Sequence, residues 1–134
     1  MKRIWLDSNL IIRIVTNDPP EQTAKAGAFL TKAEQGAFRL VVTPVIVAEC
    51  VWVLSSFYKH SKVAVAAALS KVLTNPGLEV LEERSVQSAL TLMAEKNVAF
   101  IDAFIATKAR AANEPVASFD RDYRKLGVER VAIE

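Results

Sequence analysis

Short apolar runs that are typical of strands alternate along this chain with longer stretches whose apolar residues recur at helical spacing. Five runs are predicted as strands, and they are Lys2–Leu6, Phe38–Val42, Leu78–Leu81, Val116–Phe119 and Val131–Ile133. Because strands alternate with helices throughout, we expect a mostly parallel central sheet of about five strands with helices on both faces. The pattern therefore predicts an α/β fold with three layers, α/β/α.

Helix start and stop signals separate the predicted helices. Thr43 and Pro44 form a favourable N-cap and first-turn pair, and Ser61 is a favourable N-cap for the helix after that one. The predicted helices are Ser8–Val15, Pro20 to about Gly36, Pro44 to about Tyr58, a helix from Ser61 that Asn75-Pro76-Gly77 ends, a helix with Val86, Ala89, Leu90 and Met93 on its core face, and Phe100–Asn113. Arg121–Leu126 is predicted as a short turn or helix.

Length and composition limit the function classes. The chain has 134 residues, of which 51% are hydrophobic, so we expect one domain over residues 1–134. No apolar stretch approaches the roughly 20 residues of a membrane-spanning helix. The single cysteine, Cys50, forms no internal disulfide, and no signal peptide precedes the first strand, which predicts a cytoplasmic protein.

The single histidine, His60, argues against Ser-His-Asp and Cys-His catalysis and against histidine-rich metal sites. It stands at a helix boundary, where a solvated or capping role is expected. The chain has 17 Lys and Arg residues and 15 Asp and Glu residues, so its formal net charge is only +2. A nucleic-acid partner would therefore have to meet a local basic patch.

Four acids stand in apolar sequence surroundings: Asp7, Glu49, Asp102 and Asp120. Asp7 and Asp120 follow predicted strands, and Glu49 and Asp102 fall in early turns of predicted helices. All four are therefore expected at the carboxyl edge of the sheet, where α/β proteins bind ligands. Buried carboxylates without partners are costly, so their recurrence there needs an explanation.

A divalent cation would explain such a cluster. Two unit charges about 4 Å apart repel by about 4 kcal/mol at an effective dielectric of 20, and a bound cation removes that penalty. Oxygen ligands without nearby His or Cys favour Mg²⁺ or Mn²⁺ over zinc. Metal-activated water can hydrolyse a phosphodiester without any histidine, in agreement with the composition.

Each acid also fits a structural role when taken alone. Asp7 and Asp102 are candidate helix caps, Asp120 can open the turn that follows it, and Glu49 can pair with one of three arginines, Arg3, Arg13 and Arg39. Cys50, Trp5 and Trp52 are expected in the core.

Four segments resemble the acidic motifs of PIN-domain ribonucleases, and they are Trp5–Asn9, Val47–Glu49, Ile101–Ala106 and Ser118–Tyr123. Their order and spacing across the chain look like the VapC-type toxins of toxin–antitoxin pairs. The resemblance implies a PIN-like fold, an RNA substrate, Mg²⁺ or Mn²⁺, a homodimer, and inhibition by a small VapB-type antitoxin. It further implies that cleavage leaves a 5′-phosphate and a 3′-hydroxyl.

The resemblance also implies roles for individual residues. Asp7, Glu49, Asp102 and Asp120 match the catalytic, metal-binding acids. Asn9 and Ser118 match polar positions that orient these acids or the waters of the metal. Asp122 can supplement or replace Asp120, so the fourth ligand stays open between them. Ser8 stands where the family usually has Thr and keeps the hydroxyl group.

Basic residues near the expected site are candidates for holding RNA phosphates, with solvated helix charge as the alternative for each: Arg13, Lys108, Arg121 and Arg124. The apolar helix over Val63–Leu73 is a candidate dimer or antitoxin face, with core packing as its alternative.

Two other function classes fit the sequence. One is a non-catalytic PIN-like module that binds RNA or protein and whose acids only brace the fold. The other is a different Mg²⁺-dependent phosphohydrolase or a phospho-acceptor domain, which is disfavoured because Asn9 stands where phospho-aspartate enzymes carry a second aspartate.

Overall fold

A computed structural model describes the whole sequence, residues 1–134, and confirms the α/β fold with parallel strands. The chain forms two compact units, Met1–Glu83 (the N-terminal unit) and Arg84–Glu134 (the C-terminal unit). That residues 1–134 form a single domain stays a prediction.

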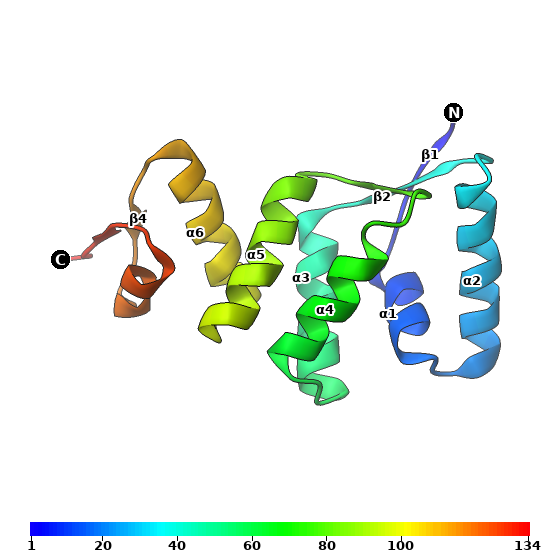
Figure 1. The fold of residues 1–134 in the computed structure, drawn as a ribbon, viewed down its shortest axis with the longest axis horizontal. Coiled ribbons are helices and arrows are strands. Elements are labelled where there is room, and N and C mark those ends of the chain that lie inside the picture. The colour runs from blue at the N-terminus through cyan, green and yellow to red at the C-terminus, as the bar shows by residue number, and fades with distance from the viewer. The chain divides into compact units, whose positions relative to one another are not determined.

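The N-terminal unit contains three strands, four α-helices and one π-helical turn (Figure 1). Its elements in chain order are β1 (Arg3–Trp5), α1 (Ser8–Thr16), α2 (Pro20–Glu34), β2 (Arg39–Val42), α3 (Pro44–Trp52), η1 (Val53–Phe57), α4 (Lys62–Val72) and β3 (Leu78–Val80). The strands form a parallel sheet in the order β1-β2-β3. Leu40 in the middle strand pairs with Ile4 on one side and Leu78 on the other, and it is fully buried with Leu30 of α2 against it.

The prediction that both tryptophans lie in the core is wrong. Trp5 is 62% exposed and Trp52 is 66% exposed. Trp5 belongs to β1, which has a strand partner on one side only in the three-stranded sheet. The Arg3 guanidinium covers its ring at 5.7 Å and also donates two hydrogen bonds to Glu79 of β3, at 2.6 and 3.2 Å. The Trp5 ring is thus covered by the Arg3 guanidinium and not by apolar side chains of the core.

The predicted N-caps are confirmed, but the helix after Thr43 is not α-helical to its end. The hydroxyl oxygens of Thr43 and Ser61 accept hydrogen bonds from the backbone N–H groups of Ile46 and Ala64, at 3.3 and 3.2 Å. The helix widens into the π-turn η1, where the Tyr58 N–H donates to the carbonyl five residues earlier. His60 beyond it is exposed, as expected for a solvated residue.

The C-terminal unit contains two helices, a two-stranded parallel sheet and a 3₁₀-helix. The elements are α5 (Glu83–Lys96), which begins on the last residue of the N-terminal unit, α6 (Phe100–Ala112), β4 (Val116–Ala117), η2 (Arg121–Leu126) and β5 (Arg130–Val131). The core stripe predicted for α5 is confirmed, since Val86, Ala89, Leu90 and Met93 are each at most 1% exposed. Both strands are shorter than predicted because only two residue pairs connect β4 to β5.

No helix of the protein combines the length and the apolar character that a membrane span requires.

The loop before β3 lies directly against the end of α2. The Asn75 side chain donates to Glu34 at 2.7 Å and accepts from the Gly77 N–H at 2.8 Å. A β-carbon at Gly77 would lie 2.8 Å from the Ala33 β-carbon and 2.9 Å from the Glu34 backbone nitrogen. Only glycine therefore fits this contact without a shift of the α2 backbone.

We predict that Gly77→Ala lowers the free energy of unfolding by about 1–3 kcal/mol, the usual cost of overpacking, as measured by urea denaturation. Gly27→Ala is the matched control, because Gly27 lies within α2 and its β-carbon would meet nothing within 4 Å. Since alanine is the better helix former, the control should raise stability by about 0.5–1 kcal/mol. Equal stability of the two variants would contradict the predicted contact.

Candidate metal centre

Asp7 lies between β1 and α1 and caps that helix. Its Oδ1 accepts a hydrogen bond from the Ser8 N–H at 2.7 Å, and its Oδ2 accepts from the Asn9 side-chain amide at 3.2 Å. Asp7 is therefore the N-cap of α1, as the structural alternative predicted, and its side chain is also exposed. Asn9 orients the carboxylate, which is the arrangement that the motif implied.

Glu49 reaches the same region from α3, which contacts α1. Between the two helices lies Cys50, which is fully buried as expected and whose thiol faces the Ser8 carbonyl oxygen at 4.0 Å. Burial, together with the smaller effects of the negative charges of Glu49 and Asp7, raises the pKa of the Cys50 thiol to about 12. Both carboxylates therefore act on one buried group of the N-terminal unit, and we call Asp7 and Glu49 the pair of this unit.

Asp102 lies in the first turn of α6, in the C-terminal unit. The Tyr123 hydroxyl of η2 donates a hydrogen bond to Asp102 Oδ1 at 3.0 Å. Four causes together raise the pKa of Tyr123 to about 12: burial first, then the hydrogen bond to Asp102, the charge of Asp102 and the charge of Asp120. Asp102 and Asp120 therefore form a second pair, and the same phenol lies near both carboxylates.

Asp120 caps η2 and lies in a short chain of hydrogen bonds. Its backbone N–H donates to Ser118 Oγ at 2.9 Å, and its Oδ1 accepts from the Asp122 N–H at 2.8 Å. Arg130 of β5 donates from Nη1 to the Ser118 carbonyl oxygen at 2.8 Å. The Asp122 carboxylate lies 3.9 Å from Lys125 Nζ, so its charge already has a partner on η2.

The expectation that the acids are buried is wrong. Asp7, Glu49 and Asp120 are exposed, and Asp102 is half-buried. The apolar neighbours that suggested burial, such as Trp52 at 66% and Phe119 at 78% exposure, lie largely in solvent themselves. Three of the four carboxylates are therefore open to a ligand, and no desolvation penalty has to be explained for them.

Two of the three arginines proposed as partners of Glu49 have other partners. Arg3 pairs with Glu79, and Arg13 donates from Nε to the Gln22 side chain at 2.9 Å. Within each unit, no group of three or more His, Cys, Asp or Glu side chains is arranged to hold a metal ion. The four acids thus divide into two pairs, one in each unit, and each pair offers only oxygen donors.

A comparison with protein families matches residues 4–129 to the PIN domain. The chain belongs to the PIN domain family. PIN domains are typically metal-dependent nucleases, and the PIN-domain nucleases bind RNA. The match spans both units and includes all four acids. A search of curated proteins finds no match to the chain.

Basic side chains of this PIN domain occur close to the acids in sequence. Arg121 and Arg124 belong to η2, directly after Asp120, and both are exposed. Lys108 is exposed on α6, whereas Arg13 is half-buried at the far end of α1 from Asp7. Three of the four candidates for RNA contact are thus exposed, and two of these three lie on η2.

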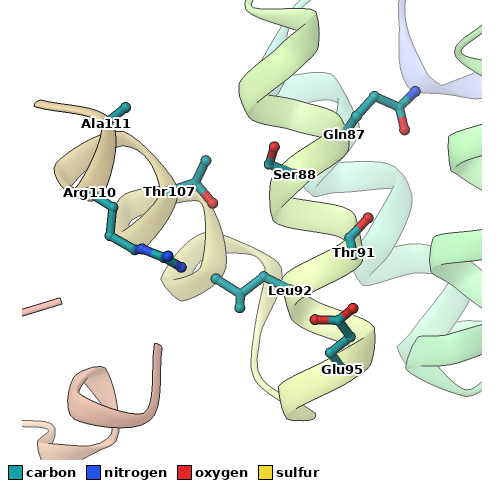
Figure 2. A pocket seen from close by; sticks show the side chains of 8 residues that line it. All are labelled: Gln87, Ser88, Thr91, Leu92, Glu95, Thr107, Arg110 and Ala111. Carbon is teal, nitrogen blue, oxygen red and sulfur yellow. The ribbon is translucent and has the colours of Figure 1, made fainter. Parts of the chain in front are cut away.

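A cavity of about 670 Å³ lies between α5 and α6 and contains none of the four acids (Figure 2). Most of its lining residues are of polar type, among them Ser88 and Thr91 on α5 and Thr107 and Arg110 on α6. This cavity is therefore separate from the candidate metal centre of the PIN domain.

Sequence reasoning missed Tyr123 and Arg130 as supports of the acids. Tyr123 stands in the fourth motif, but its hydroxyl contact depends on how η2 meets α6. One signal was available, since a buried tyrosine needs a partner for its hydroxyl group. No sequence signal pointed to Arg130, because its partner is the backbone carbonyl oxygen of Ser118.

We predict that Tyr123 ionises with a pKa of about 12 when Tyr58→Phe removes the other phenol, as measured by tyrosinate absorbance during rapid alkaline titration. Asp102→Asn should lower this pKa, but it should stay above the usual 10 because burial remains. The folded state holds the proton more tightly than the unfolded state, so stability falls as the pH rises from about 10 to about 12.

Asp122→Asn is the control for this titration, because Asp122 does not contribute to the shift. Ionisation of Tyr123 at its usual pKa in the folded protein would contradict the hydrogen bond to Asp102.

Proposed function

We propose that this protein is a Mg²⁺- or Mn²⁺-dependent endoribonuclease and the VapC-type toxin of a toxin–antitoxin pair, acting in the cytoplasm as a homodimer that a VapB-type antitoxin inhibits. The observation that carries the proposal is the PIN-domain match over residues 4–129, which contains acids at all four motif positions. The order of these motifs along the chain supports the toxin subtype.

Asp7, Glu49, Asp102 and Asp120 are proposed to act together as one metal centre. Their donor set fits the cation, because all four side chains offer only oxygen atoms, which Mg²⁺ and Mn²⁺ prefer. Carboxylates brought together without a cation would repel one another by about 4 kcal/mol per close pair at an effective dielectric of 20. Exposure of three of the acids leaves them accessible to metal and RNA.

Phosphodiester hydrolysis needs an activated water and stabilisation of negative charge. When bound, Mg²⁺ or Mn²⁺ lowers the pKa of a water ligand and stabilises the charge on the phosphoryl oxygens. Asn9 holds the Asp7 carboxylate, and Ser118 holds the loop that carries Asp120. Arg121 and Arg124 on the exposed surface of η2 are proposed to bind RNA phosphates.

The antitoxin or dimer contact is proposed for α4, the helix rich in small apolar residues. Val65 and Leu69 of α4 are buried in the N-terminal unit, whereas Val63 is 64% exposed on the same helix. One face of α4 therefore packs in the core, and an apolar side chain on another face stays exposed, where a partner protein could cover it.

A non-catalytic PIN-like module is the second candidate, and the capping geometry favours it. Asp7 caps α1 and Asp120 caps η2, so each carboxylate has a role in the fold without any metal. The two candidates differ in whether removing a carboxylate charge abolishes RNA cleavage or only weakens the fold.

We predict that Asp7→Asn, Glu49→Gln, Asp102→Asn and Asp120→Asn each lower Mn²⁺-dependent RNA cleavage by at least about 100-fold, because each removes a metal ligand. Cleavage of a labelled single-stranded RNA measures the effect. Asp18→Asn is the control, since Asp18 only accepts a hydrogen bond from Tyr58. Comparison of Asp120→Asn with Asp122→Asn identifies the fourth ligand.

The Asp7→Asn/Asp102→Asn double variant tests whether the pairs form one centre. Residues that act as a unit lose little more together than singly, so the double variant should be about as inactive as either single variant. Multiplied losses would indicate two independent sites. Full cleavage by Asp7→Asn would contradict the proposed activity and favour the binding module.

We also predict that millimolar Mg²⁺ or Mn²⁺ raises the melting temperature of the metal-free protein, because the cation binds the native state. At 100 times its Kd, a ligand stabilises by about 2.7 kcal/mol. Differential scanning fluorimetry measures the shift, and Asp102→Asn should abolish it. An equal shift in both proteins would indicate binding elsewhere.

A further inference from the structure

Tyr123 provides the one side-chain hydrogen bond that connects η2 to an acid of α6. Its hydroxyl donates to Asp102 Oδ1 at 3.0 Å, while the ring is only 5% exposed. The remaining oxygen of Asp102, Oδ2, is left for another partner. The phenol thus restricts a half-buried carboxylate from one side.

The helix η2, which carries Tyr123, has a defined capping residue at each end. Asp120 caps the first turn by accepting from the Asp122 N–H, and Gly127 ends the helix in the left-handed conformation, with φ of 75°. Leu126 is 2% exposed and anchors the last turn in the core. The backbone that carries Tyr123 therefore has little freedom to move the phenol away from Asp102.

The same short helix thus holds two of the acids. Asp120 is its N-cap residue, and Tyr123 reaches Asp102 from three positions further along. A rotation or shift of η2 would change the positions of both carboxylates together. The Tyr123 hydrogen bond therefore connects the helix that carries Asp102 to the helix that Asp120 caps.

We propose that Tyr123 is a positioning residue, which holds Asp102 in the orientation that binds Mg²⁺ or Mn²⁺ and couples it to Asp120. This inference rests on the proposed function, because it takes both aspartates as metal ligands. The physical effect is that of a hydrogen bond to a metal ligand, which orients the ligand and typically changes metal affinity or activity by 10–100-fold.

The alternative is that Asp102 merely satisfies a buried tyrosine hydroxyl. In that case, loss of the hydroxyl would lower the stability of the metal-free protein and leave metal binding unchanged. Phenylalanine separates the two roles, because it keeps the ring that fills the core and removes only the donor.

The experiment compares Tyr123→Phe with Tyr58→Phe in the full chain. Tyr58 is the matched control, since its hydroxyl donates to a carboxylate oxygen of Asp18 at 2.9 Å, and Asp18 is no proposed ligand. Binding of Mn²⁺ is measured by the electron paramagnetic resonance of free Mn²⁺, and RNA cleavage is measured in parallel. Melting of the metal-free proteins verifies folding.

Tyr123→Phe should weaken Mn²⁺ binding by about 10-fold or more and lower kcat, with KM for RNA nearly unchanged. Tyr58→Phe should bind Mn²⁺ as the wild-type chain does. Mn²⁺ affinity of Tyr123→Phe within twofold of wild type would overturn the inference and leave the proposed function standing. If the wild-type chain neither binds Mn²⁺ nor cleaves RNA, the proposed function is wrong, and the inference with it.

A second measurement does not depend on the folding of Tyr123→Phe. In Tyr58→Phe, Tyr123 is the sole phenol, and the tyrosine doublet of its Raman spectrum reports hydrogen-bond donation. Donation should persist when saturating Mg²⁺ is added. Loss of donation on metal binding would show that Tyr123 does not hold the ligand and would overturn the inference.

Discussion

The backbone N–H groups at the start of a helix lack partners within the helix, and they attract carboxylates. In this protein, Asp7 caps α1, Asp120 caps η2, and Asp102 lies in the first turn of α6. Each of these helices follows a strand or a short connection, and in each case the acid lies at the start of the helix. The same constraint that stabilises the helices therefore also fixes the positions of the proposed ligands.

The two pairs of acids have different kinds of support. In the N-terminal unit, Asp7 accepts hydrogen bonds from its neighbours Ser8 and Asn9, and the buried Cys50 thiol faces the Ser8 carbonyl oxygen. In the C-terminal unit, the support comes from residues distant in sequence, through the Tyr123 hydroxyl and the Arg130 guanidinium. The PIN-domain match extends over both units, so both kinds of support occur within the matched residues 4–129.

Elements with strong periodicity and clear caps could be predicted from the sequence. The stripe on α5 is buried as expected, and the Thr43 and Ser61 caps are correct, because both features depend on local spacing. The tryptophans could not be placed, since the exposure of Trp5 depends on its position in an edge strand and on an arginine above its ring. The π-turn after Trp52 was also missed, because the apolar pattern fits either helix type.

The candidate acids could be selected from the sequence, but their environment could not. Their apolar neighbours suggested burial, whereas the side chains at Glu49 and Asp120 are exposed, because residues adjacent in sequence need not pack together. The contribution of Tyr123 depends on the contact between η2 and α6, which no local pattern reveals. The choice of these acids as metal ligands stays a prediction, and their contacts could not be inferred from residue type or motif.

The burial of Cys50 near Asp7 and Glu49 has a practical consequence for labelling the protein. Its side chain has no exposed surface, and its thiol keeps its proton up to a pKa of about 12. Because only the thiolate reacts readily, this sulfur is inert toward alkylating reagents at neutral pH. A cysteine introduced at any exposed position would therefore be the single attachment point for a fluorophore or a spin label, without prior removal of the native one.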